Sequence, residues 1–429
     1  MALMIIALVI FGVTYLLIIT EWINKMLAAM MGGFAIVLTG IVRQKVAFAA
    51  IDWNVIFFLI GMMMVISVMR QTGLFMYLAI KIAKLAKGRP LPIMVWMFLL
   101  TTVVSAFLGS VTTIMILVPI VLLVASELKI SPIPFIITMV IASNGGGAAT
   151  MIGDPPNILI GSATHYNFLD FILNLTPPVV MITIASIGII WLLYRKGMKV
   201  SNESRARLMS YSEKNLIKSK FLLVASLIVL GLMIIALSLQ AIIHIETATV
   251  AMTAGLFLLF ISDRKKVEHI MANEIDWVTI FFFMGLFMIV ESLVETGFID
   301  MIAGSVMYIT KGEPKSTSMV ILWLSSLFSA VIDNVPFVAA MIPVLEKLGV
   351  LIGDSKAMDP VWWSLALGTC LGGNGTLIGA SANIVAVGIA NRNGFHISFK
   401  EFTKIGAIFA LLATVISTFY ILFRYYGGF

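Results

Sequence analysis

The sequence is poor in charged residues and in cysteine. Of 429 residues, 11% are charged and 61% are hydrophobic, and the mean hydropathy is +1.09. Soluble domains carry about 25% charged residues, so the composition excludes an ordinary soluble protein and predicts a polytopic membrane protein. The single cysteine, Cys370, excludes a disulfide within one chain and a thiolate metal cluster.

Catalytic motifs are also missing from the sequence. It contains no evident nucleophile–base set, phosphate-binding loop or metal-ligand cluster, and its four histidines are scattered near predicted loops. We therefore expect neither an enzyme nor a cofactor, apart from bound Na⁺. The net charge of +7 is concentrated in predicted loops, as in a membrane protein, so we expect contact with a lipid bilayer and not with nucleic acid.

The sequence contains an internal repeat. The segment Ile51-Asp-Trp-Asn-Val-Ile-Phe-Phe-Leu-Ile-Gly61 recurs as Ile275-Asp-Trp-Val-Thr-Ile-Phe-Phe-Phe-Met-Gly285. The order of further matches is kept, and Thr150-Met-Ile-Gly153 recurs as Thr376-Leu-Ile-Gly379. Matches that keep one order from residues 51–61 to residues 150–153 indicate a duplication.

The duplication predicts an all-α polytopic membrane protein of two inverted repeats. Each repeat is expected to have five transmembrane spans plus a re-entrant helical hairpin and a broken helix, and an odd number of crossings inverts the second repeat. The expected boundaries are 1–195 for the first repeat (hairpin 91–126, broken helix 133–164), 196–219 for a basic cytoplasmic linker, and 220–429 for the second repeat (hairpin 317–348, broken helix 361–390).

The distribution of lysine and arginine predicts the orientation. Placing the basic linker in the cytoplasm puts about 21 of the 28 basic residues inside, as the positive-inside rule requires. Both termini then face outward from the cytoplasmic (inner) membrane. An alternative with every hairpin arm as a full span has the same charge pattern; the expected second arms, only 12–14 residues long, disfavour it, since a span needs about 20.

The two broken helices carry the most unusual stretches. Asn144-Gly-Gly-Gly-Ala-Ala-Thr-Met-Ile-Gly-Asp-Pro-Pro-Asn157 contains three glycines and a proline pair, which we expect to interrupt a helix. Its counterpart is Leu371-Gly-Gly-Asn-Gly-Thr-Leu-Ile-Gly-Ala-Ser-Ala-Asn383. Irregular backbone inside a membrane persists where it lines a cavity or is buried in protein, so these breaks and the two hairpin tips predict a binding site.

Hydroxyl, amide and backbone oxygens at the breaks suit Na⁺ or a small polar solute. For Na⁺ itself the candidates are Ser110, Gly153, Asn334 and Gly379. Asn157 and Asn383 could alternatively only cap the second half-helices. The complete set of substrate- or ion-binding candidates is Ser110, Thr112, Thr113, Asn144, Thr150, Gly153, Asp154, Asn157, Asp333, Asn334, Asn374, Thr376, Gly379, Ser381 and Asn383.

Acidic residues inside the predicted membrane region are candidates for proton coupling, since an uncompensated charge there is costly. Asp333 lies at the second hairpin tip without a basic residue near it in the sequence. Asp154 precedes a proline pair, where a helix N-cap is the alternative role. Glu291, on the predicted span 277–293, is the third candidate.

These motifs resemble the ion transporter superfamily. The segments that carry the resemblance are Ile152-Gly-Asp-Pro-Pro-Asn-Ile158, Asp333-Asn-Val-Pro-Phe337 and 371–383. The nearest resemblance is to the arsenite-permease branch, with the arsenical pump proteins and the melanosomal P protein; NhaD-type antiporters and dicarboxylate symporters are more distant. The resemblance implies a homodimer with scaffold and moving transport domains, in which each hairpin tip and its neighbouring break line one of two quasi-symmetric sites.

The resemblance implies a secondary active transporter that works by alternating access. We expect an inorganic solute or anion as cargo, with arsenite as first choice, coupled to H⁺ or Na⁺. The alternatives are a Na⁺/H⁺ antiporter, a Na⁺-coupled dicarboxylate symporter and a channel-like anion conductance. The dicarboxylate alternative is disfavoured because no lysine or arginine lies at a break in the sequence.

Overall fold

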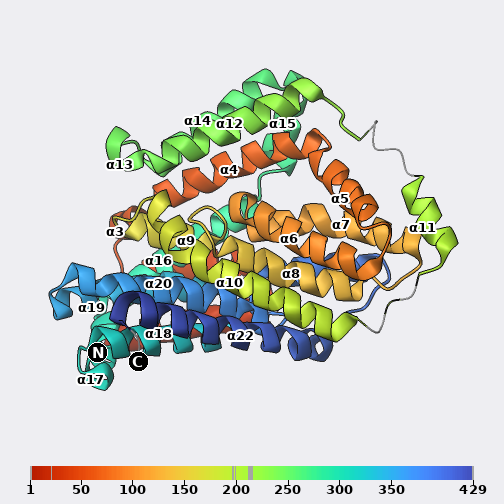
Figure 1. Cartoon of the computed structure of the whole chain (residues 1–429). Helices are drawn as coiled ribbons and strands as arrows, with labels where there is room; N and C mark the ends of the chain where they lie inside the picture. The colour runs from red at the N-terminus through yellow and green to blue at the C-terminus, as the bar shows by residue number, and fades with distance from the viewer. Residues whose placement is uncertain (1, 21, 196–197, 199, 211–215, 428–429) are drawn as a thin grey trace.

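A computed structural model describes residues 2–20, 22–195, 198, 200–210 and 216–427, and every regular element in these ranges is a helix (Figure 1). Nine of the described helices are long and apolar enough to cross a membrane. Many large apolar side chains on them are exposed, for example Leu16 at 60% and Phe221 at 70%, as expected of surfaces that face lipid. The predicted all-α membrane fold is confirmed.

The helices of the two repeats follow one another in the same order. The first series is α1 (Ala2–Thr20), α2 (Lys25–Leu38), α3 (Gln44–Ala49), α4 (Trp53–Gln71), α5 (Leu74–Leu85), α6 (Pro90–Leu108), α7 (Ser110–Leu128), α8 (Ile133–Gly147), α9 (Pro155–Ala163) and α10 (Phe168–Tyr194). The second series is α12 (Lys220–Ser238), α13 (Gln240–Ile243), α14 (Thr247–Ile261), α15 (Arg264–Asn273), α16 (Trp277–Glu295), α17 (Phe298–Thr310), α18 (Pro314–Ser329), α19 (Asn334–Ile352), α20 (Ser355–Gly372), a 3₁₀ turn (Gly373–Gly375), α21 (Ser381–Arg392) and α22 (Phe399–Tyr426).

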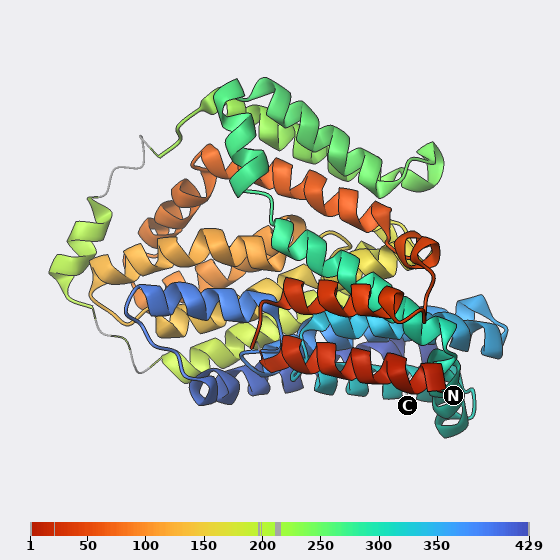
Figure 2. The ribbon, with the colours of Figure 1, turned by 180° about the vertical axis from the view of Figure 1, so that it is seen from behind.

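Helices of one repeat cross helices of the other through equivalent glycines. A Cβ built on Gly61 of α4 would lie 2.4 Å from the Ala251 carbonyl carbon of α14, and one on Gly285 of α16 would lie 2.5 Å from that of Ala29 on α2. Gly285 is the duplicate of Gly61, so the same crossing occurs twice. Figure 1 shows α4 beside α14, and Figure 2 shows α2 crossing α16 from behind.

The hairpins and the broken helices pack against one another. Within each repeat the first hairpin arm packs on the first half of the broken helix, α6 on α8 and α18 on α20. The second arms cross between repeats, so that α7 contacts α21 and α19 contacts α9. Both hairpin tips and both breaks therefore meet in one central region.

Several predicted lengths are wrong. The second arms α7 and α19 have 19 residues each, because tip residues that we excluded are helical and both helices also extend further at their other ends. The length argument against full spans therefore fails. In contrast, α2 has only 14 residues, shorter than the expected span 26–42.

The predicted linker 196–219 contains a short helix, α11 (Asn202–Met209), whose Leu208 is fully buried. Residues 196, 197, 199 and 211–215 of this linker lie outside the described residues. The helices α3, α13 and α15 were not predicted from the sequence. The boundaries of the two repeats stay a prediction.

Candidate functional site

The first break begins later than predicted, because the three glycines are part of α8. A Cβ on Gly146 would lie 2.1 Å from the Thr102 carbonyl oxygen of α6, and one on Gly147 would lie 2.7 Å from the Gly153 carbonyl oxygen. Helical glycines are tolerated here because the neighbouring backbones approach too closely for a side chain. The break itself consists of 148–154, and α9 starts at Pro155.

Asn157 and Asn383 hold the two breaks in shape. Asn157 Nδ2 donates to the carbonyls of Ala148 at 3.2 Å and Thr150 at 2.9 Å. Asn383 Nδ2 donates to Gly373 and Thr376, each at 2.8 Å. These amides satisfy carbonyls of the irregular backbone that water cannot reach, and they do not cap the following helices, whose N-caps are Asp154 and Ala380.

Thr150 and Thr376 attach the breaks to the hairpins. The Thr150 hydroxyl donates to the Ala106 carbonyl, and the Thr376 hydroxyl donates to that of Ala330. Gly153 and Gly379 allow the two sides of each break to touch, since a Cβ there would lie 2.5 and 2.7 Å from the carbonyl oxygens of Gly147 and Gly373. These four predicted site residues therefore shape the breaks.

Asp154 lies at the centre and is contacted by both hairpin tips. Asp154 occupies the N-cap position of α9, but its side chain makes no hydrogen bond with the backbone of this helix. The alternative role of a helix cap therefore does not explain the aspartate. Ser110 Oγ of the first tip donates to Asp154 Oδ1 at 2.6 Å, and Asn334 Nδ2 of the second tip donates to Oδ2 at 2.9 Å. Ser110 and Asn334 are equivalent positions of the two repeats, yet Asp154 itself, 2% exposed, has Ala380 as its counterpart.

Asp333 has a basic partner, Lys25, that is distant from it in the sequence. Lys25 Nζ, at the start of α2, lies 3.8 Å from Asp333 Oδ2 and donates to Ser381 Oγ at 2.8 Å. Ser381 Oγ in turn donates to Asp333 Oδ2 at 2.5 Å. The prediction that no basic residue lies at a break is therefore wrong: the fold brings Lys25 to the second tip from more than 300 positions away.

Asparagines link the two breaks across the repeats. Asn144 Nδ2 of α8 donates to Asn374 Oδ1 and to Asn383 Oδ1, each at 2.9 Å. At the position equivalent to Asn144, the Cys370 thiol lies 3.6 Å from Asn157 Oδ1. Cys370 is fully buried. The single thiol thus serves as a polar contact of the core.

A cavity of about 170 Å³ lies at this centre. Of the predicted site residues, Ser110, Asp154, Asn334 and Ser381 line it, together with Lys25 and Asp276. An adjoining cavity of about 330 Å³ is lined by Asp333 and shares Lys25, Ser381 and Val385 with the first. Lys25 and Asp276 are close to the breaks only in space, so local spacing did not identify them as site residues.

The remaining candidates lie away from this cavity. Thr112 is partly buried on α7, and Thr113 is fully buried with no hydrogen-bond partner for its hydroxyl oxygen. Glu291 is eight residues beyond Phe283, the last cavity-lining residue of α16, or about 12 Å along the helix. The structure therefore does not bring Glu291 to the site.

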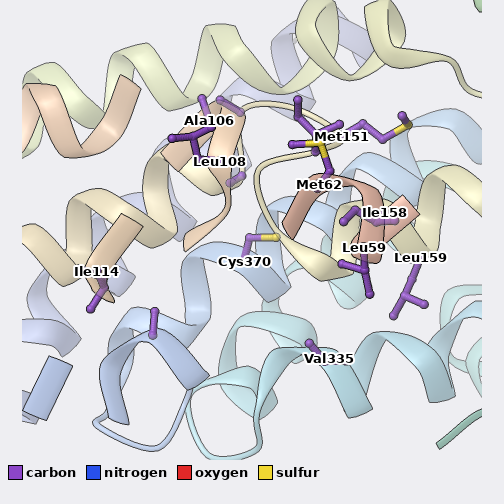
Figure 3. Packing of buried hydrophobic residues seen from close by; sticks show 14 of the residues in the cluster. Leu59, Met62, Ala106, Leu108, Ile114, Met151, Ile158, Leu159, Val335 and Cys370 are labelled. Carbon is purple, nitrogen blue, oxygen red and sulfur yellow. The ribbon is translucent and has the colours of Figure 1, made fainter. Parts of the chain in front are cut away.

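Apolar side chains enclose the first break. Figure 3 shows Leu59 and Met62 of α4 facing Met151 and Ile158, with the Cys370 sulfur nearby. The polar neighbours of the Asp154 carboxylate are Ser110 and Asn334 of the hairpin tips, together with the Cys370 thiol of α20. A site of one carboxylate, one hydroxyl and one amide suits a proton or a small hard cation, and the described residues contain no group of three or more His, Cys, Asp or Glu able to hold a metal ion.

The known proteins similar to this chain include some that are named as transporters. An uncharacterized transporter of Mycobacterium bovis is 39% identical over 426 residues, which is 98% of this chain and 99% of that protein. The 46 kDa membrane protein of Mycobacterium leprae is 38% identical over 425 residues, with 98% and 99% covered. The P protein of Sus scrofa is 30% identical over 498 residues, which is 97% of this chain and 59% of the P protein.

The fold is also similar to that of a solved transporter. The Alcanivorax borkumensis YdaH transporter, described as having an unusual topology, matches with a TM-score of 0.57 at 16% identity, covering 92% of this chain and 89% of that one. The family model described as citrate transporter matches residues 15–368. The predicted resemblance to the ion transporter superfamily is thereby confirmed, and the chain is a membrane transporter that belongs to the citrate transporter (CitMHS) family.

Proposed function

We propose that this protein is a secondary active transporter in which a cation bound at Asp154 is coupled to the movement of a small anion. The observation that carries the proposal is the Asp154 carboxylate, 2% exposed and hydrogen-bonded to Ser110 and Asn334. Both partners are neutral. A buried carboxylate without a positive partner is costly, and binding H⁺ or Na⁺ offsets that cost.

The geometry supports coupling because both hairpins contact the same carboxylate. A cation that binds Asp154 changes the contacts of Ser110 at one tip and of Asn334 at the other. A ligand shifts a conformational equilibrium only through different contacts in the two states. Both hairpins, with the broken helices, are then the parts that move relative to the crossed helices α2, α4, α14 and α16 during alternating access.

A carboxylate anion is our first choice of cargo. The family description names citrate, and the cavity beside Asp154 contains the ammonium of Lys25. Arsenite, our first choice from the sequence, becomes the second candidate, since the hydroxyl of Ser110 and the amide of Asn334 could hold neutral arsenous acid. The homodimer, the inner-membrane location and the outward termini remain part of the proposal.

Uptake into proteoliposomes tests the function. Labelled citrate, succinate and arsenite are offered under imposed H⁺ or Na⁺ gradients, and we expect saturable accumulation of one of them with one gradient. Gradient-driven Na⁺/H⁺ exchange with no solute would support the antiporter instead, and single-channel currents would support a conductance. Either result overturns the proposal.

Asp154→Asn tests the coupling residue. The amide cannot be charged, so we expect solute exchange to continue while gradient-driven accumulation falls at least about tenfold. The matched control is Asp300→Asn, which removes an exposed carboxylate 2.7 Å from Lys347 and should leave accumulation unchanged. Full accumulation by Asp154→Asn would show that another group couples.

A further inference from the structure

We propose that Lys25 binds the anionic group of the cargo and that Asp333 occupies the place of this group when cargo is absent. This inference rests on the proposed function and assigns the residue that selects the cargo. Among the described residues that line the two central cavities, Lys25 is the one basic side chain. Any anion in either cavity therefore has a single full positive charge to bind.

Lys25 is held in position without being fully paired. Its Nζ donates to Ser381 Oγ at 2.8 Å and lies 5.3 Å from the centre of the Phe282 ring. The Asp333 oxygen is 3.8 Å away, beyond ordinary hydrogen-bond distance. An ammonium has three donors, so an incoming oxyanion can form a shorter, charge-assisted bond than Asp333 does.

Asp333 has hydrogen-bond partners in addition to its contact with Lys25, and these remain when cargo binds. Its Oδ2 accepts from Ser381 at 2.5 Å, and its Oδ1 accepts from the Val335 backbone N–H at the start of α19, at 3.4 Å. The carboxylate thus keeps contacts at the helix N-terminus after Lys25 leaves it. The ammonium of Lys25 therefore has a negative partner in both states: the Asp333 carboxylate when cargo is absent, and the anionic group of the cargo when it is bound.

The two breaks differ in the way this assignment requires. The helix α9 begins with Pro155 and Pro156, which lack backbone donors. The helix α21 begins with Ser381 and has no side-chain cap, so its free N–H groups and its dipole favour an anion. The first break therefore carries the acid for the coupling cation, and the second presents Lys25 and a helix N-terminus to an anion.

The position of Lys25 connects cargo with the coupling site. Lys25 and Ser381 line both cavities, and the smaller one, about 170 Å³, also contains Asp154. At about 30 Å³ for each water in the liquid, this volume suits a small carboxylate or inorganic oxyanion. Neutral arsenous acid would gain nothing from the ammonium, so charge selectivity is the direct consequence.

Charge restoration at position 25 tests the inference. Lys25→Cys is purified and its equilibrium binding of citrate, succinate and phosphate is measured; loss of the charge should weaken binding of the bound anion about tenfold or more. Modification with a methanethiosulfonate that adds an ethylammonium group should restore binding. The matched reagent that adds an uncharged methyl group should not.

Wild-type protein treated with the same reagents is the control, because Cys370 is fully buried. Lys25→Arg should retain anion binding. The double variant Lys25→Met with Asp333→Asn removes both charges of this pair, so neither is left without its partner. A merely structural ion pair predicts wild-type binding by this variant, whereas our assignment predicts weak binding by a folded protein.

Unchanged anion binding by Lys25→Cys, or restoration by both reagents or by neither after complete labelling, would overturn the inference. Binding that responds to Lys25 in a protein that shows no gradient-driven uptake would retain the inference and refute the proposed function. Gradient-driven uptake with the same affinity in wild type and Lys25→Met would do the reverse.

Discussion

At the scale of single residues, the duplicated positions have taken different roles. The position equivalent to Asp154 is Ala380, and the position equivalent to Asp333 is Gly109. Ser110 and Asn334 are equivalent, yet they bind opposite oxygens of one carboxylate. The repeat therefore supplies a symmetric frame, while the acidic residues of the proposed site are placed asymmetrically within it.

Asn144 offers a residue-scale test of the link between the breaks. Asn144→Ala removes the amide that donates to both Asn374 and Asn383. Leaving buried acceptors unpaired costs about 1–3 kcal/mol, so we expect the melting temperature in detergent to fall. The control is Asn393→Ala, whose exposed amide bonds only to the Ile389 carbonyl; an equal loss in both variants would contradict the assignment.

At the scale of helices, the glycine crossings hold the two repeats together. The α4–α14 and α2–α16 contacts bring backbone against backbone, as small residues allow in membrane helices. Neither crossing has room for a methyl group. We therefore expect the four helices to form a rigid unit against which the hairpins move in the proposed transport cycle.

Alanine substitutions test these crossings. A Cβ on Gly61 or Gly285 would meet backbone atoms at 2.4 or 2.5 Å, and backbone cannot move aside as a side chain can. We expect each variant to lose most of its folded, monodisperse yield in size-exclusion chromatography. Gly231→Ala in α12, with nothing within 4 Å, should behave as wild type; normal yield of Gly61→Ala would refute the tight crossing.

Much of this arrangement could be predicted from the sequence, and the failures have physical causes. The repeated motifs that contain Gly61 and Gly285 revealed the duplication. The lengths of the apolar runs predicted the positions of most helices. The glycines of 145–147 predicted a break, but they are helical, and close packing of Gly146 against Thr102 and of Gly147 against Gly153 favours glycine there. Lys25 was missed because its partner Asp333 is close only in three dimensions, which local spacing cannot show.

At the scale of the whole molecule, several polar contacts join the repeats away from the cavity, and one of them is made by Tyr166. Tyr166, between α9 and α10, donates to Asp359 of α20 at 2.5 Å, and its ring lies 4.5 Å from that of Trp363. The predicted orientation places this contact on the outer side. It would then keep the outer side closed while Lys25 and Asp276 face the cytoplasm.

Tyr166→Phe tests this closure. The ring packing is retained while the hydrogen bond to a carboxylate, of about 1.5–3 kcal/mol, is lost, so outward-open states should become more frequent. We expect faster modification of Cys370 by an impermeant thiol reagent applied outside. Tyr77→Phe, which removes only an exposed contact with Lys81, is the control, and equal rates for the two variants would refute the closure.

The packing of α4 and α2 against helices of the second repeat, α14 and α16, has a consequence for biosynthesis. The surface of α4 around Gly61 is completed only by Ala251 of α14, which emerges from the ribosome about 190 residues later. At a synthesis rate of about 5–20 residues per second, roughly 10–40 s pass before the partner helix exists. During that time the first half stays in the membrane with its closest-packed face open to lipid, so we expect truncation before α14 to leave an unstable fragment that is rapidly degraded.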